Sequence, residues 1–312
     1  MEKKLFGTTS PHLRSQETVQ SVMKDVLIAL LPATIGSIVI FRLNALVLIA
    51  LAIISAVATE YIIQRFLMKK ESTISDLSAV VTGLLLAMNL PSSAPWWIPI
   101  VGSAFAIAIV KQVFGGLGHN FMNPALAARA MLVASWPVIM TGSWVTPGAD
   151  AVSTATVLGV LKEGGDLAYS TWDLFIGNVG GCLGETSALL LIIGGIYLLF
   201  KKVINWRIPF TYIGTTAIMM LIMGKGIDGT IVHILAGGLM LGAFFMATDY
   251  ASSPVSPKGQ IIYGVGCGLL TALIRQFGGY PEGVSYSILL MNVAAPIIDK
   301  FTKPHIFGKV KK

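Results

Sequence analysis

Long uninterrupted stretches of apolar residues dominate the hydrophobic pattern of this chain, with short polar breaks between them. A run of about 20 apolar residues has the length of a helix that crosses a bilayer. The runs cover residues 25–41, 44–63, 77–91, 96–114, 118–136, 173–200, 208–224, 229–247, 260–275 and 284–300. The pattern therefore predicts an all-α integral membrane protein with about ten transmembrane helices.

Two of these runs are too short or too rich in glycine to form uninterrupted spans. The strongly apolar part of the third run covers only residues 81–90, and four glycines interrupt residues 177–184. A helix that breaks inside a membrane frees backbone groups that neighbouring helices must cover. We therefore expect glycine-broken helices inside a compact bundle.

The composition excludes a soluble protein and narrows the chemistry. Only 12% of the residues are charged, against about 25% in soluble domains. The net charge of +7 is not gathered into a basic stripe with interleaved aromatic residues, so no nucleic acid is expected as a partner. The two cysteines, Cys182 and Cys267, are too few for an iron–sulfur cluster or a Cys-rich zinc site, and no metal site is expected.

The distribution of Lys and Arg predicts the orientation. With ten crossings both termini lie on one side, and that side carries seventeen Lys and Arg residues when Lys111 is counted in a loop there. The opposite side carries four, namely Arg42, Lys162, Lys225 and Arg275, while Arg129 remains inside the membrane. Because basic loops stay on the cytoplasmic side, both termini are predicted to be cytoplasmic in the cell (inner) membrane.

Two sequence blocks recur at an offset near 160 residues. AMNLPSS (87–93) matches ATDYASS (247–253), and IVKQVFGG (109–116) matches LIRQFGG (273–279). The predicted orientation places the matched blocks on opposite sides, so the two five-helix halves are expected to be inverted repeats, as in many transporter folds. The expected organisation is a cytoplasmic tail (1–24), a first membrane repeat (25–136), an outer loop (137–172), a second membrane repeat (173–301) and a basic cytoplasmic tail (302–312).

The outer loop contains a short Ser/Thr/Ala element, Ser153-Thr154-Ala155-Thr156. In one interpretation, Ser153 or Thr154 caps a helix that begins with the following apolar residues. In the other, the element is a covalent attachment site, because a threonine hydroxyl flanked by small residues can form a phosphodiester with the phosphate of flavin mononucleotide (FMN). Taken alone, the four residues favour the cap.

Six elements in order along the chain resemble a known family. They are DVLIALLPA (25–33), FMNPALAARA (121–130), ASWP (134–137), the Ser-x-Ala-Thr element ending at Thr156, GETS (184–187) and ATDYASSPVSPKG (247–259). Over almost its whole length the chain resembles RnfD, a membrane component of the Rnf electron-transport complex, and it is similar to NqrB of the sodium-translocating NADH:quinone reductase.

The resemblance implies a membrane electron-transfer subunit of an ion-translocating (Na⁺ or H⁺) ferredoxin:NAD⁺ oxidoreductase. It implies a covalent FMN, esterified to Thr156 on the outer face by a flavin transferase. The implied partners are the other Rnf subunits, including the iron–sulfur, NADH-binding and second FMN-carrying subunits. The chain has neither clusters nor a nicotinamide-binding fold, so no catalytic residue is assigned to it and its partners must meet ferredoxin and NAD⁺.

Arg129 has two interpretations. Its guanidinium offers five donors in a planar fork suited to the flavin phosphate, and Asn123-Pro124 fits the start of the helix that carries it. Alternatively, Arg129 pairs with carbonyl groups of broken helices, as intramembrane charges often do.

Two further polar positions are candidate site residues. Glu185 follows the glycine-broken segment and marks an ion path, or else it caps a half-helix near the outer interface. Asp249 and Ser252 form the inner counterpart of the segment 89–93, and the resemblance implies a noncovalent riboflavin there. The alternative for these two residues is a capped loop bounded by prolines.

A channel or secondary transporter without redox chemistry is the competing class. Inverted repeats and broken helices fit that architecture equally well. Covalent flavin separates the two, because only the electron carrier would contain it.

Overall fold

The structure is a computed structural model that describes residues 17–142, 144, 156–165, 170–177, 179–185 and 187–303. The elements are α1 (Val19–Ile62), η1 (Ile63–Leu67), η2 (Ile74–Asp76), α2 (Ser78–Met88), α3 (Trp97–Phe105), η3 (Ala106–Gln112), α4 (Pro124–Ser135), α5 (Pro137–Thr141), α6 (Val157–Lys162), α7 (Thr171–Ile176), α8 (Ala188–Phe200), α9 (Arg207–Ile222), α10 (Gly226–Leu235), α11 (Leu239–Leu241), η4 (Gly242–Met246), α12 (Pro257–Phe277) and α13 (Val284–Thr302). All of them are helical, which confirms the all-α prediction for the described residues.

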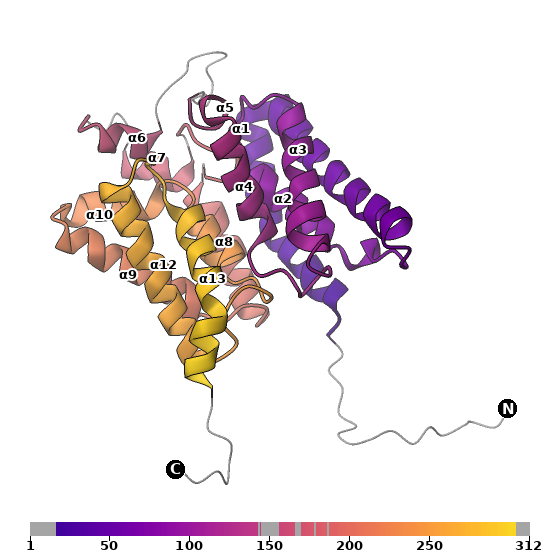
Figure 1. The fold of residues 1–312 in the computed structure, drawn as a ribbon. Helices are drawn as coiled ribbons and strands as arrows, with labels where there is room; N and C mark the ends of the chain where they lie inside the picture. Colours follow the sequence, from indigo (N-terminus) through magenta and orange to yellow (C-terminus); the bar gives the residue numbers. More distant parts are fainter. Residues whose placement is uncertain are drawn as a thin grey trace, which may run out of the picture.

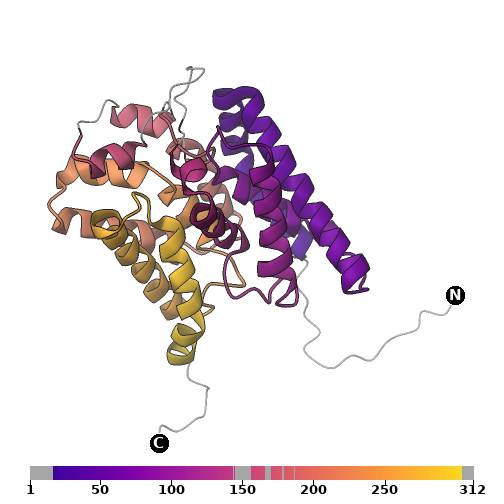
Figure 2. The same cartoon turned by 45° about the horizontal axis from the view of Figure 1, so that its top comes forward.

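The helices form two groups that lie side by side. Figure 1 shows α1 to α4 in indigo to magenta on one side and α9 to α13 in orange to yellow on the other. The turned view in Figure 2 keeps the same separation. The short helices α6 and α7 lie at one end of the second group, opposite the end where the last helix, α13, finishes (Figure 1).

Helix α1 consists of two arms. Arg42 has φ 55° and ψ −134°, which is not a helical conformation, and the chain bends there. The second arm returns toward the side where the chain begins (Figures 1 and 2). The bend falls between the predicted spans 25–41 and 44–63, so the predicted boundary between them is confirmed.

Few of the described helices are long enough to cross a membrane alone. Residues Val19–Leu67 and helix α13 meet the length and apolarity of a span, and α10 with α11 and η4 would make a third that is bent by 62°. Helices α2, α4, α8 and α9, and the pair α3 and η3, are shorter and apolar. The run 173–200 is not a single helix, because α7 ends at Ile176, Gly177 adopts φ 113°, and α8 begins only at Ala188. The predicted break within residues 177–184 is thus confirmed, whereas residues 81–88 belong to the single short helix α2 and ten crossings remains a prediction.

Two basic residues that we assigned to loops are buried inside helical segments. Lys111 lies in η3 with 2% of its surface exposed, and its Nζ contacts Glu60 Oε2 at 2.8 Å and Ser78 Oγ at 2.6 Å. Arg275 lies in α12 with 4% exposed, and it donates to the carbonyl oxygens of His233 and Glu282. Both loop assignments were wrong, because a cation that finds a carboxylate or several carbonyls can stay inside the protein.

Close backbone contacts at glycines hold the helices together. A Cβ on Gly83 of α2 would lie 2.8 Å from the carbonyl oxygen of Ala52 in α1, and a Cβ on Gly268 of α12 would lie 2.7 Å from that of Tyr212 in α9. Gly194 of α8 meets the carbonyl of Ala29 in α1 in the same way. Small residues at helix contacts are typical of membrane bundles.

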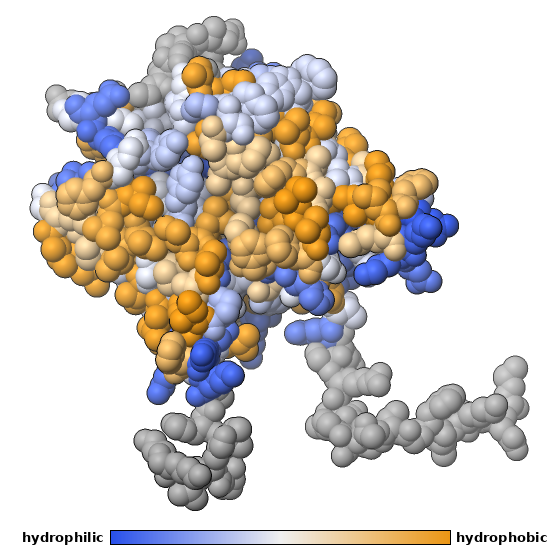
Figure 3. Space-filling view, in the orientation of Figure 1, coloured by the Kyte–Doolittle hydropathy of each residue, from blue (hydrophilic) through white to orange (hydrophobic). Residues whose placement is uncertain are grey.

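The surface is apolar over a broad area. In Figure 3, hydrophobic residues cover the middle of the visible face, and hydrophilic residues lie at its lower, right-hand and upper left edges. Strongly exposed apolar side chains include Val39, Phe200 and Ile222, with 72%, 89% and 72% of their surface exposed. An exposed apolar surface of this extent is expected to contact lipid or other membrane subunits.

Candidate functional site

Two broken segments meet at the centre of the molecule. The chain leaving α2 and the chain approaching α8 run antiparallel through an isolated bridge between Pro91 and Cys182. Leu183 N donates to Leu90 O at 3.0 Å, and Gly184 N donates to Met88 O at 2.8 Å. The two breaks therefore satisfy each other's backbone groups, which is the condition for a broken helix inside a membrane.

Helix α4 begins as the sequence predicts. The Asn123 side chain accepts from Ala125 N at 3.0 Å and from Leu126 N at 3.3 Å, with Pro124 at the first helical position. Its amide also donates to Met246 O at 3.2 Å, which ties the start of α4 to η4. Asn123 thus fixes the register of the helix that carries Arg129.

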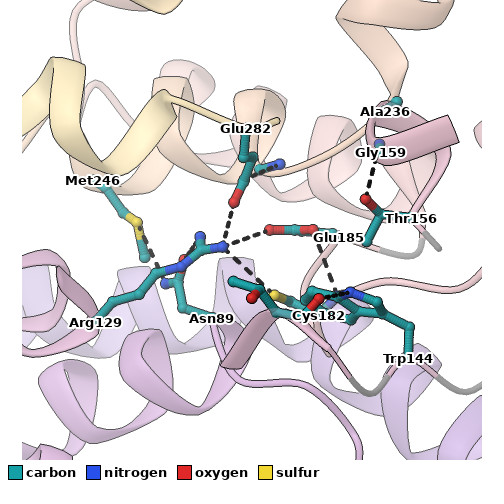
Figure 4. A network of polar contacts seen from close by, with 12 residues as sticks. Asn89, Arg129, Trp144, Thr156, Gly159, Cys182, Glu185, Ala236, Met246 and Glu282 are labelled. Carbon is teal, nitrogen blue, oxygen red and sulfur yellow. Dashed lines mark hydrogen bonds and ion pairs between the residues drawn. The ribbon is translucent and has the colours of Figure 1, made fainter. Parts of the chain in front are cut away.

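Arg129 is buried, with 8% of its surface exposed, and contacts acidic and amide side chains. Its Nη1 donates to Asn89 Oδ1 at 2.8 Å, and its Nη2 forms ion pairs with Glu185 at 3.4 Å and with Glu282 (Figure 4). Cys182 Sγ lies 3.7 Å from the same nitrogen. The carbonyl-binding role that we considered for Arg129 belongs instead to Arg275 in α12.

Glu282 is a site residue that our sequence reasoning missed. It lies in the loop between α12 and α13, where its Oε1 accepts from Gly238 N at 2.7 Å and its other oxygen pairs with Arg129. Arg275 fixes this loop by donating to the Glu282 carbonyl at 3.0 Å. The available signal was a carboxylate between Pro281 and Gly283 at a break between two apolar runs.

A cavity of about 360 Å³, which we call the Thr156 cavity, lies beside this cluster. Its walls come from α4, from α6 and its cap, from the segment before α8, and from the first turn of α13 with the loop before it; they include Arg129, Thr156, Glu185, Glu282, Tyr280, Ser285 and Tyr286. Three predicted site residues, Thr156, Arg129 and Glu185, are therefore brought together. Figure 4 shows Thr156 on the same side of the cluster as Glu185.

Thr156 is the N-cap of α6. Its Oγ1 accepts from Gly159 N at 3.1 Å, and its backbone is extended with φ −65° and ψ 155°. A helix does follow the element, but the predicted caps, Ser153 or Thr154, were wrong, because the helix begins only at Val157 and its cap is Thr156. Ser153 and Thr154 lie outside the described residues.

A second cavity of about 550 Å³, the Asp249 cavity, is lined by the first turns of α1, by α2 and by residues that precede α4. Asp249 Oδ2 accepts from Ser252 Oγ at 2.8 Å and from Asn120 Nδ2 at 3.3 Å, so the predicted pair Asp249 and Ser252 is in contact. Asn120, Asn123 and Asp249 line the cavity, whereas Ser252 contacts Asp249 but does not line the cavity itself. Within the described ranges no group of three His, Cys, Asp or Glu residues could hold a metal ion.

Comparisons with known proteins agree on one family. The family model described as the NQR2, RnfD, RnfE family matches residues 7–308. The chain is 59% identical to the D subunit of the Na(+)-translocating ferredoxin:NAD(+) oxidoreductase complex of Acetobacterium woodii, over 100% of this chain and 98% of that protein. It is 47% identical to the D subunit of the proton-translocating ferredoxin:NAD(+) oxidoreductase complex of Clostridium ljungdahlii, over 99% and 98% of the two chains. It is 38% identical to the D subunit of the ion-translocating oxidoreductase complex of Stutzerimonas stutzeri, over 94% and 93%.

Proposed function

Because the chain belongs to the NQR2, RnfD, RnfE family, we propose that it is the RnfD component of an ion-translocating ferredoxin:NAD⁺ oxidoreductase and carries a covalent FMN on Thr156. The names of its relatives describe subunits of ion-translocating ferredoxin:NAD(+) oxidoreductase complexes. One name specifies Na⁺ and the other the proton, so we propose that the complex translocates one of these two ions. The observation that carries the flavin proposal is the presence of Thr156 and Arg129 in the walls of one cavity.

The residues of the Thr156 cavity fit a flavin. Its volume of about 360 Å³ falls in the range of small-molecule sites, roughly 300–1,000 Å³. The Ser285 hydroxyl lines it, is buried, and has no hydrogen-bond partner in the described part of the chain. Aromatic rings of Tyr280, Tyr286 and Trp144 supply apolar surface for a flat ligand. When bound, FMN supplies one- and two-electron transfer.

The chain's own residues attach and orient the group. Thr156 offers its hydroxyl to the phosphodiester from the start of α6. Arg129 faces the same cavity, and its remaining donors are available to a phosphate while Asn89, Glu185 and Glu282 fix the plane of the guanidinium. Glu185 pairs with Arg129 and lines the same cavity, so a buried carboxylate lies beside the proposed flavin. We therefore keep Glu185 as the ion-path candidate.

An inverted repeat of five helical elements supports a second flavin site. Helix α3 begins at Trp97 and α12 at Pro257, and α4 begins at Pro124 and α13 at Val284, an offset of 160 residues in both cases. On this scheme the two arms of α1 correspond to α8 and α9, and α2 corresponds to α11 with η4.

The two cavities follow the same correspondence. Asn120, Asn123 and Ala125 line the Asp249 cavity, and the residues 160 positions later, Tyr280, Gly283 and Ser285, line the Thr156 cavity. We therefore propose that the Asp249 cavity holds a noncovalent riboflavin. Its larger volume agrees with a ligand that is held by the cavity walls rather than by a covalent link.

The charge distribution supports cytoplasmic termini in the cell inner membrane. Without Lys111 and Arg275, which are buried, the count is sixteen basic residues against three. Electron donors and acceptors must come from partners, namely the iron–sulfur, NADH-binding and second FMN-carrying subunits, because two cysteines cannot hold a cluster. A flavin transferase is required to form the phosphodiester.

Covalent flavin is tested on the denatured chain. The purified chain, run on a denaturing gel, should fluoresce under ultraviolet light, and Thr156→Ala should give a dark band at unchanged protein abundance. Ser170→Ala is the matched control, because Ser170 also caps a short helix of this region, α7, and does not line the cavity. Retained fluorescence in Thr156→Ala would reject the attachment site. A dark wild-type band would favour the channel or transporter.

A further inference from the structure

Tyr280 and Tyr286 stack on each other and form an aromatic wall, the tyrosine wall, of the Thr156 cavity. Their ring centroids lie 5.5 Å apart with an angle of 23° between the planes. The other aromatic pairs of the described chain meet edge-on, except Trp172 and Phe175, whose planes are inclined by 33°. Because both tyrosines line the cavity, this pair presents a surface suited to stacking a planar ring.

Ser285 adds an unsatisfied polar atom next to this wall. It lies in the first turn of α13, directly before Tyr286, and only 6% of its surface is exposed. Its Oγ finds no partner within the described ranges, although the neighbouring Ser287 in the same helix forms several hydrogen bonds. Buried hydroxyls are normally paired, so a hydroxyl that lines a cavity without a partner indicates an acceptor supplied by a ligand.

Helix α6 connects Thr156, the proposed attachment residue, to the loop that carries Tyr280. Thr156 caps one end of this helix, and Lys162 at the other end donates to Tyr280 O at 3.2 Å and to Gly278 O. Six helical residues extend about 9 Å. In FMN a five-carbon ribityl chain separates the phosphate from the isoalloxazine ring. A flavin tethered at Thr156 therefore has its ring beyond the tether, where the tyrosines and Ser285 lie.

We propose that the isoalloxazine ring stacks on the Tyr280–Tyr286 pair and accepts a hydrogen bond from Ser285 Oγ at a ring carbonyl oxygen. This inference rests on the proposed covalent flavin and adds the residues that set its electronic properties. An electron-rich tyrosine face stabilises the electron-poor oxidised ring. A hydrogen bond to a ring carbonyl stabilises the added negative charge of the reduced ring. The two contacts therefore shift the reduction potential in opposite directions.

The test uses the full chain purified in detergent, with three variants. Tyr286→Leu should shift the reduction potential of the covalent flavin upward and alter its visible absorption bands. Tyr286→Phe should leave the potential and the absorption bands as in the wild type. Ser285→Ala should shift the potential downward. All three should keep wild-type fluorescence on a denaturing gel. Tyr61→Leu is the control, because Tyr61 lies in α1 with 44% of its surface exposed and does not line the cavity.

The outcomes separate this inference from the proposed function. Normal covalent flavin in Tyr286→Leu and Ser285→Ala, with potential and absorption bands of the wild type, overturns the stacking site and leaves the attachment at Thr156 intact. Shifts of the same sign in the two variants also overturn it. A wild-type band without fluorescence overturns the proposed flavin and this inference together.

Discussion

The guanidinium of Arg129 is held by three side chains that come from distant parts of the sequence. Asn89 lies 40 residues before it, and Glu185 and Glu282 lie 56 and 153 residues after it. Each of these contacts restricts rotation of the planar guanidinium group. Arg129 is therefore a fixed donor in the cavity wall, because its orientation is set before any ligand binds.

Arg129→Lys should reduce covalent flavin or change its potential while the folded protein persists. A lysine keeps the charge, but a single ammonium cannot reach both Asn89 and the two carboxylates in the same planar arrangement. Flavin per mole of purified protein, measured beside membrane abundance, checks this expectation.

The control for Arg129→Lys is Arg207→Lys. Arg207 lies in α9, donates to Gln260 Oε1 at 3.5 Å and does not line the Thr156 cavity. This variant should keep the flavin content and the membrane abundance of the wild type. If Arg129→Lys lowers abundance while the folded protein keeps its flavin and potential, Arg129 has a structural role only.

For single residues, the sequence predicted helix caps and short-range contacts better than contacts between distant residues. Asn123 as the cap of α4 and Asp249 beside Ser252 followed from local rules, and both contacts are present. The partners of Arg129 did not, because local patterns carry no information about contacts between residues 153 positions apart. Lys111 was misplaced for the same reason, since its carboxylate, Glu60, lies 51 residues away.

Among the elements, α2 links a close helix contact to the site. Gly83 allows it to lie against α1, and the C-terminal end of α2 delivers Asn89 to Arg129. A side chain at Gly83 would separate α2 from α1 and displace the Asn89 contact. The packing of one glycine is thus coupled to the geometry of the cavity.

Gly83→Ala should destabilise the protein by about 1–3 kcal/mol, the usual cost of overpacking. The added Cβ would meet backbone atoms of Ala52 and Ile53, which cannot rotate away. Thermal unfolding of the detergent-purified protein measures the change.

Gly214→Ala in α9 is the matched control for Gly83→Ala. A Cβ there would find no atom within 4 Å, and alanine is the better helix former by about 1 kcal/mol. This variant should unfold at the wild-type temperature or above it. Equal destabilisation of the two variants would contradict the packing argument.

The hydrophobic pattern predicted which residues are helical but not which broken helix ends lie against each other. The bend at Arg42 and the break after Ile176 coincide with polar or glycine positions in the sequence. The pairing of the two broken segments through Pro91 and Cys182 was not predictable, because apolar composition does not encode which broken ends meet.

For the whole molecule, the two cavities border opposite ends of the helical bundle. Helix α6, at the upper end in Figure 1, borders the Thr156 cavity, and the beginning of α1, at the lower end, borders the Asp249 cavity. The chain enters α1 and leaves α13, whose last turn carries Lys300, at the second of these ends (Figure 1). The Thr156 cavity is therefore expected on the outer side of the membrane.

Single cysteines test this orientation in intact cells. Glu163→Cys, just after α6, should react with an impermeant thiol reagent added outside, whereas Lys201→Cys, just after α8, should react only after permeabilisation. Both positions are exposed, and the native Cys182 and Cys267 are buried, so background labelling should be low. Labelling in the reverse order would place the Thr156 cavity on the cytoplasmic side.

The hydrogen-bonded crossing of the two broken segments limits how the molecule can move. A transporter that exposes its site alternately to each side does so by rocking one half against the other. Here such rocking would have to break two backbone hydrogen bonds, from Leu183 N to Leu90 O and from Gly184 N to Met88 O, together with the ion pairs of Arg129. The membrane interior offers no water to replace these contacts. We therefore expect the two halves to stay fixed relative to each other during turnover. Electrons would then cross a constant distance between the two proposed flavins.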